Sequence, residues 1–157
     1  MVVGGGPGGM SAALAAALKG HDVTLYEQSD RLGGQLYLAA APPGREDFSQ
    51  LAKDLEAQLA VNKIPVFFKQ MVDGKMIASE KPDVVIVATG AKAVIPPIPG
   101  IDLPHVVQAW DVLEDKVATG ARVAIIGGGA VGVETALFLA EKGTLSAEAV
   151  KFLLVNG

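Results

Sequence analysis

The sequence predicts an α/β fold with a Rossmann-like parallel sheet and helices on both faces. The main observation is a glycine signature, G-x-G-x-x-G, that occurs twice, at Gly4–Gly9 and at Gly127–Gly132, 123 residues apart. Each copy follows a short β-branched run and leads into an alanine-rich stretch, the strand–turn–helix context that the signature requires. Two copies in this context indicate two dinucleotides on one molecule. Electron transfer between a nicotinamide and a flavin is the chemistry that most often needs such a pair.

The first half of the chain alternates between strand-like and helix-like segments. Met1–Val3 is short and apolar, which is typical of a buried parallel strand, and Gly8–Lys19 is an alanine-rich helix closed by Gly20. The elements expected next are a strand at Val23–Tyr26, a loop from Gly33 through Pro43, a helix over Arg45–Asn62, weaker strands or turns at Val66–Lys69 and Lys75–Ala78, and a buried strand at Asp83–Ala88. The helical periodicity comes from Phe48, Leu51, Leu55 and Leu59.

A proline-rich stretch, Gly90–Pro104, is the best linker in the chain. The elements expected after it are a short helix at Trp110–Leu113, a buried strand at Arg122–Ile126, a helix at Ala130–Lys142 and a further helix over Ser146–Val155. We therefore expect a first nucleotide-binding domain over residues 1–95, a linker over 96–120, and the start of a second domain over 121–157 that is cut before its fold is complete.

Composition narrows the class of protein. Half of the residues are apolar and 19% are charged, so a packed core is expected, and a net charge of −4 argues against nucleic-acid or anionic-membrane partners. The absence of cysteine removes disulfides, cysteine-ligated clusters and a redox dithiol from this segment. His21 and His105 lack metal-ligand spacing, and we expect them, with Tyr37 and Trp110, to pack or face solvent. Neither a signal peptide nor a membrane span fits the first residues, so a cytoplasmic protein is expected.

The first glycine loop carries a complete fingerprint. Unpaired N–H groups at a helix N-terminus, together with the helix dipole, form a site for a pyrophosphate. In that loop Gly4 permits the tight turn, Gly6 allows close approach of the phosphates and Gly9 allows the helix to pack on the strand. Glu27 ends the second strand 23 residues after Gly4, where a carboxylate would accept hydrogen bonds from an adenosine ribose and repel a 2′-phosphate. The alternative is an ordinary glycine turn, with Glu27 as a solvated strand end.

The second glycine loop departs from this pattern. Gly127, Gly129 and Gly132 repeat the phosphate loop, but Val150 takes the place of Glu27. Glu148 lies nearby in sequence, and its expected place inside a helix makes it a solvated residue. The choice between NADH and NADPH is therefore left open.

Several segments together resemble a known family. They are GGGPGG from Gly4, Glu27, RLGGQL from Arg31, DVVIVATGA from Asp83, PPIPG from Pro96 and IIGGGAVGVE from Ile125. This set resembles the two-dinucleotide flavoprotein reductases. Within them it looks most like the C-terminal half of the NADH:flavin oxidoreductases, which include NADH oxidase, 2,4-dienoyl-CoA reductase and trimethylamine dehydrogenase. The sequence LGGQL followed by AAAPPGREDF carries the narrower match.

The resemblance implies FAD, or ADP alone, at the first loop and NAD(P)H at the second. In the family a barrel with FMN and an iron–sulfur cluster precedes this region, so the rest of its own polypeptide is an implied partner, and no part of that barrel is in this sequence. The segment that completes the flavin domain is also missing. By resemblance the cofactor-binding residues are Gly6, Pro7, Gly8 and Gly9 at the pyrophosphate, Glu27 at the ribose, Arg31 near the adenosine, Gly34 and Gln35 near the phosphates or flavin, Thr89 and Gly90 beside the dinucleotide, and Glu134 toward the nicotinamide.

The resulting hypothesis is the dinucleotide-binding part of a flavin-dependent oxidoreductase that passes hydride from NAD(P)H to FAD. No catalytic side chain is assigned, because the cofactors carry the chemistry. The alternative is a structural ADP-binding module without electron transfer of its own, and for Glu134 the alternative is a carboxylate stabilised by a helix N-terminus. A disulfide reductase would need a cysteine pair. Homo-oligomerisation is left open.

Overall fold

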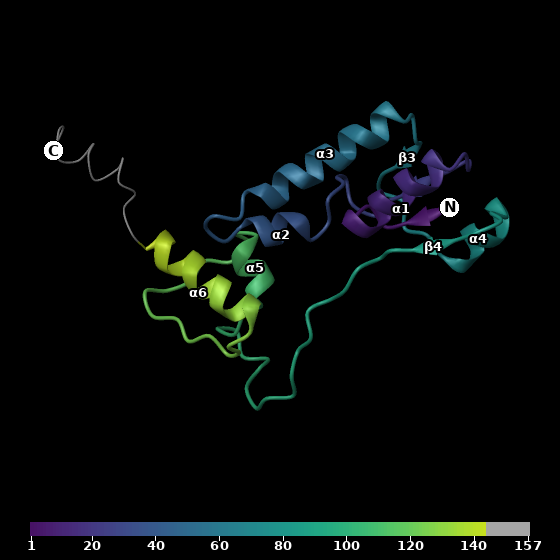
Figure 1. Cartoon of the computed structure of the whole chain (residues 1–157). Coiled ribbons are helices and arrows are strands. Elements are labelled where there is room, and N and C mark those ends of the chain that lie inside the picture. The colour runs from purple at the N-terminus through teal and green to yellow at the C-terminus, as the bar shows by residue number, and fades with distance from the viewer. Residues whose placement is uncertain (144–157) are drawn as a thin grey trace, which may run out of the picture. The chain divides into compact units, whose positions relative to one another are not determined.

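The computed structural model describes residues 1–143 (Figure 1). The expected helix over Ser146–Val155, with Glu148 and Val150, lies outside this range. By their internal contacts the described residues form two units. Unit 1 is Met1–Ala40 with Glu46–Lys92, and unit 2 is Ala41–Arg45 with the described residues from Ala93 onward.

Unit 1 is built around a parallel sheet of four short strands. They are β1 (Val2–Val3), β2 (Leu25–Tyr26), β3 (Val66–Phe67) and β4 (Ile86–Val87), in the spatial order β3-β2-β1-β4. This order is that of a Rossmann-type sheet, and it confirms the predicted fold class. Between β1 and β4 the strand order reverses, so the carboxyl ends of these two strands border the crevice in which such sheets bind ligands.

Helix α1 (Pro7–Leu18) begins and ends with the residues that the sequence indicates. Gly6 is its N-cap and Pro7 occupies its first turn, where the missing N–H costs nothing. After Lys19 the chain turns through Gly20 at φ +87°, a left-handed conformation that glycine adopts without strain. The predicted helix Gly8–Lys19 is therefore confirmed within one residue at either end.

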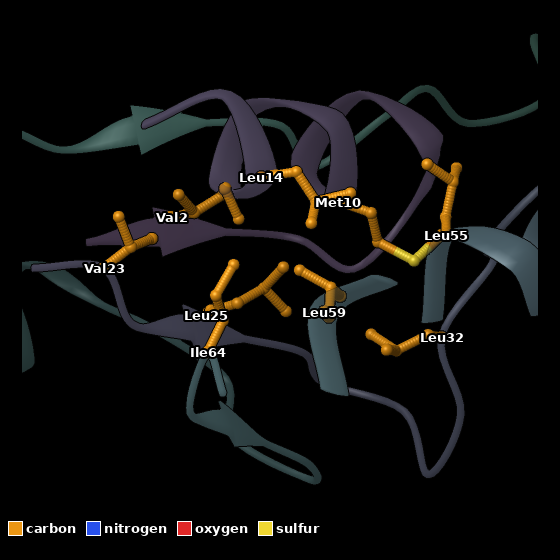
Figure 2. Packing of buried hydrophobic residues seen from close by; sticks show 10 residues of the cluster. Val2, Met10, Leu14, Val23, Leu25, Leu32, Leu55, Leu59 and Ile64 are labelled. Atoms are coloured by element: carbon orange, nitrogen blue, oxygen red, sulfur yellow. The ribbon is translucent and has the colours of Figure 1, made fainter. Parts of the chain in front are cut away.

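The core of unit 1 lies on one face of the sheet. Val2 and Leu25 pair in register and are buried there, and Met10 and Leu14 of α1 pack onto them (Figure 2). Leu59, from helix α3 (Asp47–Val61), closes the same cluster. The sequences of β1 and β2 are apolar without alternation, as is typical of the central strands of a parallel sheet.

The predicted hydrophobic stripe of α3 is partly wrong. Leu55 and Leu59 are buried as expected, but Phe48 and Leu51 are 36% and 43% exposed, and Ala52 is buried in their place. A small residue is accommodated at that position because Gly33 packs closely against the Ala52 methyl group. Periodicity identified the helix, and close packing decided which turn faces inward.

Two segments that were expected to be non-helical contain helices. The segment after Gly34 was expected to be a loop, but it contains α2 (Leu36–Ala40), which packs against α3. Lys75–Ala78, expected as a strand or turn, belongs to α4 (Gly74–Glu80). Asp73 caps this helix, since its Oδ1 accepts the Met76 N–H at 2.8 Å, and a cap of this type favours a helix over a strand.

The second face of the sheet carries Val3, Tyr26, Phe67 and Val87, which share one register. The rings of Tyr26 and Phe67 stack with centroids 5.2 Å apart. Burial raises the pKa of the Tyr26 phenol, and the nearby Glu80 carboxylate of α4 adds to the effect. The crossover from β3 to β4 thus brings α4 toward this face.

Strand β4 differs from the buried strand expected at Asp83–Ala88. Only Ile86–Val87 pair with the sheet, and Val84 and Val87 are 65% and 71% exposed. The physical reason is that β4 is an edge strand, which has a neighbour on one side only. Its β-branched composition identified the strand but could not indicate its neighbours.

Unit 2 contains α5 (Ala109–Leu113) and α6 (Ala130–Lys142), both as predicted, and the two helices pack together. The predicted buried strand at Arg122–Ile126 is wrong for the described structure, in which these residues are exposed and unpaired with any strand. A parallel strand forms only on a neighbouring strand, and the described part of unit 2 supplies none. None of the helices in residues 1–143 combines the length and apolarity needed to cross a membrane.

Candidate dinucleotide-binding site

The first glycine loop lies where β1 ends, beside the end of β4. Gly4 has φ +107°, and a Cβ atom there would lie 2.3 Å from the Ala88 carbonyl oxygen. At Gly9 a Cβ atom would lie 1.8 Å from the Gly4 carbonyl oxygen. Gly6 and Gly8, in contrast, have no protein atom within 4 Å of the position of a Cβ. Two glycines therefore allow the loop to pack, and two leave open surface above it.

This open surface is bordered by backbone donors. The first helical hydrogen bond of α1 runs from the Met10 N–H to the Gly6 carbonyl at 3.0 Å. The N–H groups of Gly8 and Gly9 precede it in the first turn, where helix geometry provides no acceptor. With the positive end of the helix dipole beneath them, these donors fit an anionic group such as a pyrophosphate.

Glu27 is buried against the same loop, with only 9% of its surface exposed. Its Oε2 accepts the Gly5 N–H at 2.6 Å, and its Oε1 accepts the Ser29 N–H at 2.8 Å. The interpretation as a solvated strand end is therefore wrong. The carboxylate joins the ends of β1 and β2, and each of its oxygens keeps a further lone pair for a ligand hydroxyl.

The RLGGQL segment closes over the loop. The Gly33 N–H donates to the Gly5 carbonyl at 2.9 Å, and a Cβ atom on Gly34 would lie 3.1 Å from the Gly6 Cα. Gln35 reaches the segment after β4, where its Nε2 donates to the Ala91 carbonyl at 2.9 Å. The sequence-predicted residues of the first site are thus brought together around one loop.

Thr89 and Gly90 follow β4 and lie at this edge of the sheet. The Thr89 Cα would be 3.2 Å from a Cβ on Gly4, and Gly90 has φ +73°, with the Gln35 amide 3.5 Å from the position of its Cβ. Both residues are exposed. They lie at the point where the strand order reverses, which is where such sheets bind ligands. Their place beside a dinucleotide stays a prediction.

The second glycine loop repeats the geometry of the first. Gly127 has φ +117°, and a Cβ on Gly132 would lie 1.9 Å from the Gly127 carbonyl oxygen, as between Gly9 and Gly4. The N-cap Gly129 has φ −78° and ψ −177°, against −74° and −179° at Gly6. The loops differ in their surroundings, since nothing lies within 4 Å of a Cβ on Gly127.

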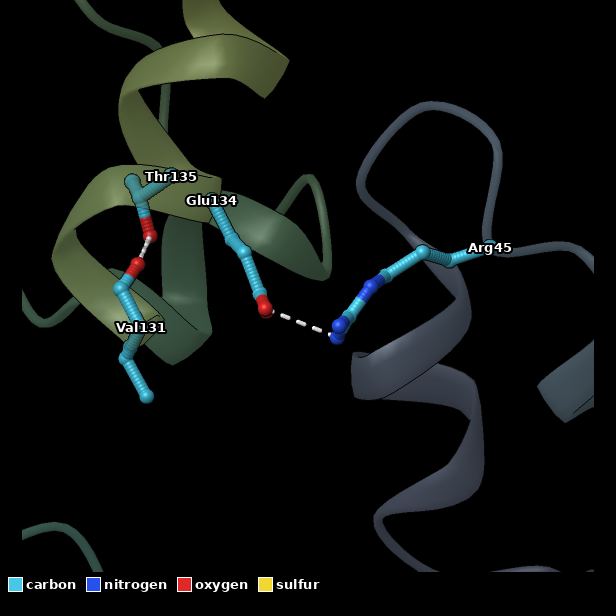
Figure 3. A network of polar contacts seen from close by, with 4 residues as sticks. All are labelled: Arg45, Val131, Glu134 and Thr135. Carbon is cyan, nitrogen blue, oxygen red and sulfur yellow. Dashed lines mark hydrogen bonds and ion pairs between the residues drawn. The ribbon is translucent and has the colours of Figure 1, made fainter. Parts of the chain in front are cut away.

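Glu134, in the helix that follows the second loop, forms an ion pair with Arg45 (Figure 3). The Arg45 Nη1 lies 2.7 Å from the Glu134 Oε1, and the two side chains are 41% and 22% exposed. The adjacent Thr135 turns the other way, and its hydroxyl donates to the Val131 carbonyl at 2.7 Å. The place of Glu134 near a helix N-terminus was expected from the sequence, whereas its ion-pair partner Arg45 was not.

Other contributors to the site act through the backbone or through packing, and sequence reasoning missed them. They are Gly5, Ser29, Gly33, Ala88 and Ala91. Gly5 and Gly33 could have been found from the sequence, because each lies next to another glycine and consecutive glycines often mark a close approach of two backbone segments. Within residues 1–143 no group of three or more acidic or histidine side chains is placed to hold a metal ion.

A parallel sheet of this order, with a glycine loop and an acidic residue at the ends of its strands, defines an α/β dinucleotide-binding protein. The family model for pyridine nucleotide-disulphide oxidoreductases matches residues 1–154, and the chain belongs to this family. The family binds FAD and NAD(P)H, which agrees with the expected cofactors. Because the chain contains no cysteine, it cannot itself supply the dithiol of a disulfide reaction.

Relatives support the narrower resemblance to NADH oxidases and related flavin-dependent reductases. The chain is 45% identical to a metal reductase of Desulforamulus reducens, over 99% of this chain and 24% of that protein. It is 48% identical to an NADH oxidase of Thermoanaerobacter brockii, over 91% of this chain and 23% of that protein. A solved 2-naphthoyl-CoA reductase superposes with a TM-score of 0.85 at 39% identity, over 91% of this chain and 22% of that one. The chain therefore spans about a quarter of the length of these relatives.

Proposed function

We propose that the chain is the dinucleotide-binding part of an NAD(P)H-dependent flavoprotein oxidoreductase, with the ADP half of FAD at the first loop and the nicotinamide nucleotide at the second. One observation carries the proposal: two glycine loops in one chain share the same backbone geometry, down to the carbonyl that only a glycine can face. A protein that bound a single nucleotide would need only one of them.

The residue roles follow from this assignment. At the first loop, Gly6, Pro7, Gly8 and Gly9 would hold the pyrophosphate through the backbone, and Glu27 the ribose, with its carboxylate already oriented by the loop. Gly34, Gln35, Thr89 and Gly90 would border the rest of the flavin nucleotide, and Arg31 would lie near the adenosine, where it would supply positive charge. At the second loop, Gly127, Gly129 and Gly132 would face the pyrophosphate of NAD(P)H, and Glu134 would lie toward its nicotinamide. When bound, the cofactors supply the hydride and its acceptor, and these residues orient them.

Two parts of the proposal concern the protein beyond this chain. The relatives are about four times as long, which supports a partner domain within the same polypeptide. The electron acceptor would be reached through that domain.

A structural ADP-binding module is the second candidate. Two observations favour it: Gly127 lacks the close neighbour that Gly4 has in Ala88, and Arg122–Ile126 pair with no strand of the described structure. A first loop that holds ADP needs no second nucleotide. In this case the second loop would serve only as a helix start.

The test uses the intact protein and two matched variants. Released nucleotides are identified by chromatography, and anaerobic reduction of the flavin by NADH and NADPH is followed by absorbance. Gly132→Ala places a Cβ against the Gly127 carbonyl, whereas Gly128→Ala meets no atom within 4 Å. If overpacking of about 1–3 kcal/mol raises the barrier to hydride transfer, reduction should slow roughly 5- to 160-fold in Gly132→Ala and stay near the wild-type rate in Gly128→Ala.

Bound flavin should be equal in the three proteins. Release of ADP without FAD, or equal reduction rates in both variants, would overturn the electron-transfer proposal in favour of the module.

A further inference from the structure

Arg31 and Tyr37 form a contact that no role assigned above explains. The Arg31 guanidinium carbon lies 4.4 Å from the centroid of the Tyr37 ring, which is cation–π geometry. Arg31 is exposed, and Tyr37 is half-buried at the start of α2. A long cationic side chain at the surface samples many rotamers unless a neighbour restricts it.

The ring of Tyr37 is itself held in place. A Cβ atom on Gly33 would lie 2.6 Å from the Tyr37 Cε2 and 2.9 Å from the Ala52 methyl carbon. Gly33 is buried, and the absence of a Cβ there leaves room for the edge of the Tyr37 ring that carries Cδ2 and Cε2. The ring thus contacts Gly33 along one edge, and the guanidinium of Arg31 lies over its face.

The same segment is fastened to the first glycine loop. Leu32 packs against Gly5, the Gly33 N–H donates to the Gly5 carbonyl at 2.9 Å, and the backbone at Arg31 is held by Ser29, whose hydroxyl donates to the Arg31 carbonyl at 2.8 Å. Arg31 is therefore one residue away from direct contact with the loop. Its positive charge is thus carried by a segment that contacts the loop, and the start of α1 in that loop offers backbone donors to an anion.

We propose that Tyr37 is a positioning residue that holds Arg31 as a cationic arm for the diphosphate of the nucleotide at the first loop. The inference rests on the proposed function of that loop and adds a positioning residue to it. The guanidinium attracts the diphosphate, and the ring reduces the number of conformations that Arg31 must give up on binding. The tyrosine hydroxyl is not needed for this role, but the aromatic face is.

The experiment measures ADP affinity by calorimetry on the intact protein after bound nucleotide is removed, at low and at high salt. Tyr37→Leu removes the aromatic face and should weaken ADP binding roughly two- to fivefold, the strength of an exposed cation–π contact. Tyr37→Phe keeps the face and should bind as the wild type does. Arg31→Gln should weaken binding and reduce its salt dependence, because the screened charge is gone.

A double-mutant cycle separates positioning from packing. If Tyr37 acts through Arg31, then Tyr37→Leu should have no further effect in the Arg31→Gln background, and it should reduce the salt dependence in the wild-type background. Equal losses in both backgrounds, or wild-type affinity in Tyr37→Leu, would overturn the inference while ADP still binds. Failure of the wild type to bind ADP would overturn the proposed function of the first loop and this inference with it.

Discussion

Replacing Gly9 by alanine should destabilise the protein, while the same replacement at the adjacent Gly8 should not. A Cβ on Gly9 would lie 1.8 Å from the Gly4 carbonyl oxygen, and the atoms must separate by about 1.2 Å to reach 3.0 Å, below which real Cβ atoms essentially never approach a neighbour. Gly4 cannot easily retreat, because its N–H is hydrogen-bonded to the Tyr26 carbonyl at 2.8 Å. At Gly8 the added methyl group meets no atom within 4 Å.

The magnitude follows from comparing the two variants. Both replacements add the same helix propensity, about 1 kcal/mol, so this contribution cancels in the difference. What remains is the overpacking at Gly9, about 1–3 kcal/mol. At roughly 2–4 °C per kcal/mol for a chain of this size, the melting temperature of Gly9→Ala should be about 2–12 °C below that of Gly8→Ala.

The assay is thermal unfolding of both variants and the wild type, followed by circular dichroism under identical conditions. Gly8→Ala should melt at or slightly above the wild-type temperature. If Gly9→Ala melted as high as Gly8→Ala, the helix and the loop would not pack as closely as described, and the argument for glycine at both positions would fail.

Three further predictions follow from contacts in the site and the sheet. Glu27→Gln should lower the free energy of unfolding by about 1–3 kcal/mol, because an amide offers one acceptor where two N–H groups need one each, while the exposed Glu56→Gln should change nothing in urea unfolding. The pKa of Tyr26 is raised, so its contribution to the free energy of unfolding is full below the ordinary pKa of 10.0 and is lost as the pH rises through the folded-state pKa. Between about pH 9 and 11 the free energy of unfolding should therefore fall less in Tyr26→Phe than in the wild type. An equal fall in both proteins would contradict the burial of Tyr26. Arg45→Gln should cost at most about 1 kcal/mol, since its ion pair with Glu134 is partly exposed, and a larger loss in 1 M salt than in dilute buffer would exclude an ionic origin.

Local patterns were enough to predict the elements that contain the two loops. The helices that start at Pro7 and Ala130 were recognised because a glycine loop, an alanine-rich body and a closing Lys-Gly follow one another directly in the sequence. The same holds for Gly4, Gly9, Gly127 and Gly132, whose roles follow from a turn of fixed length. The site residues brought together in unit 1 were also predicted, though as separate segments.

Prediction from local sequence failed where a segment is compatible with more than one structure. Lys75–Ala78 was expected as a strand or turn, but it is helical, and the Asp73 side chain caps this helix by accepting the Met76 N–H. Arg122–Ile126 has the composition of a buried strand, but hydrogen bonds to neighbours, and not composition, make a strand. Val87 is apolar and yet exposed, because β4 lies at the edge of the sheet.

The repeated G-x-G-x-x-G motif alone specified the backbone of both loops. Gly4 and Gly127 have φ of +107° and +117°, and at Gly9 and Gly132 a carbonyl oxygen lies where a Cβ would clash, so both kinds of position favour glycine. Tertiary structure decided what each loop faces. It placed the Ala88 carbonyl beside Gly4, the buried carboxylate of Glu27 on the Gly5 N–H, and Tyr37 beneath Arg31. These contacts join segments that are distant in the chain or turned toward each other by packing, and no local pattern encodes which donor will meet which acceptor.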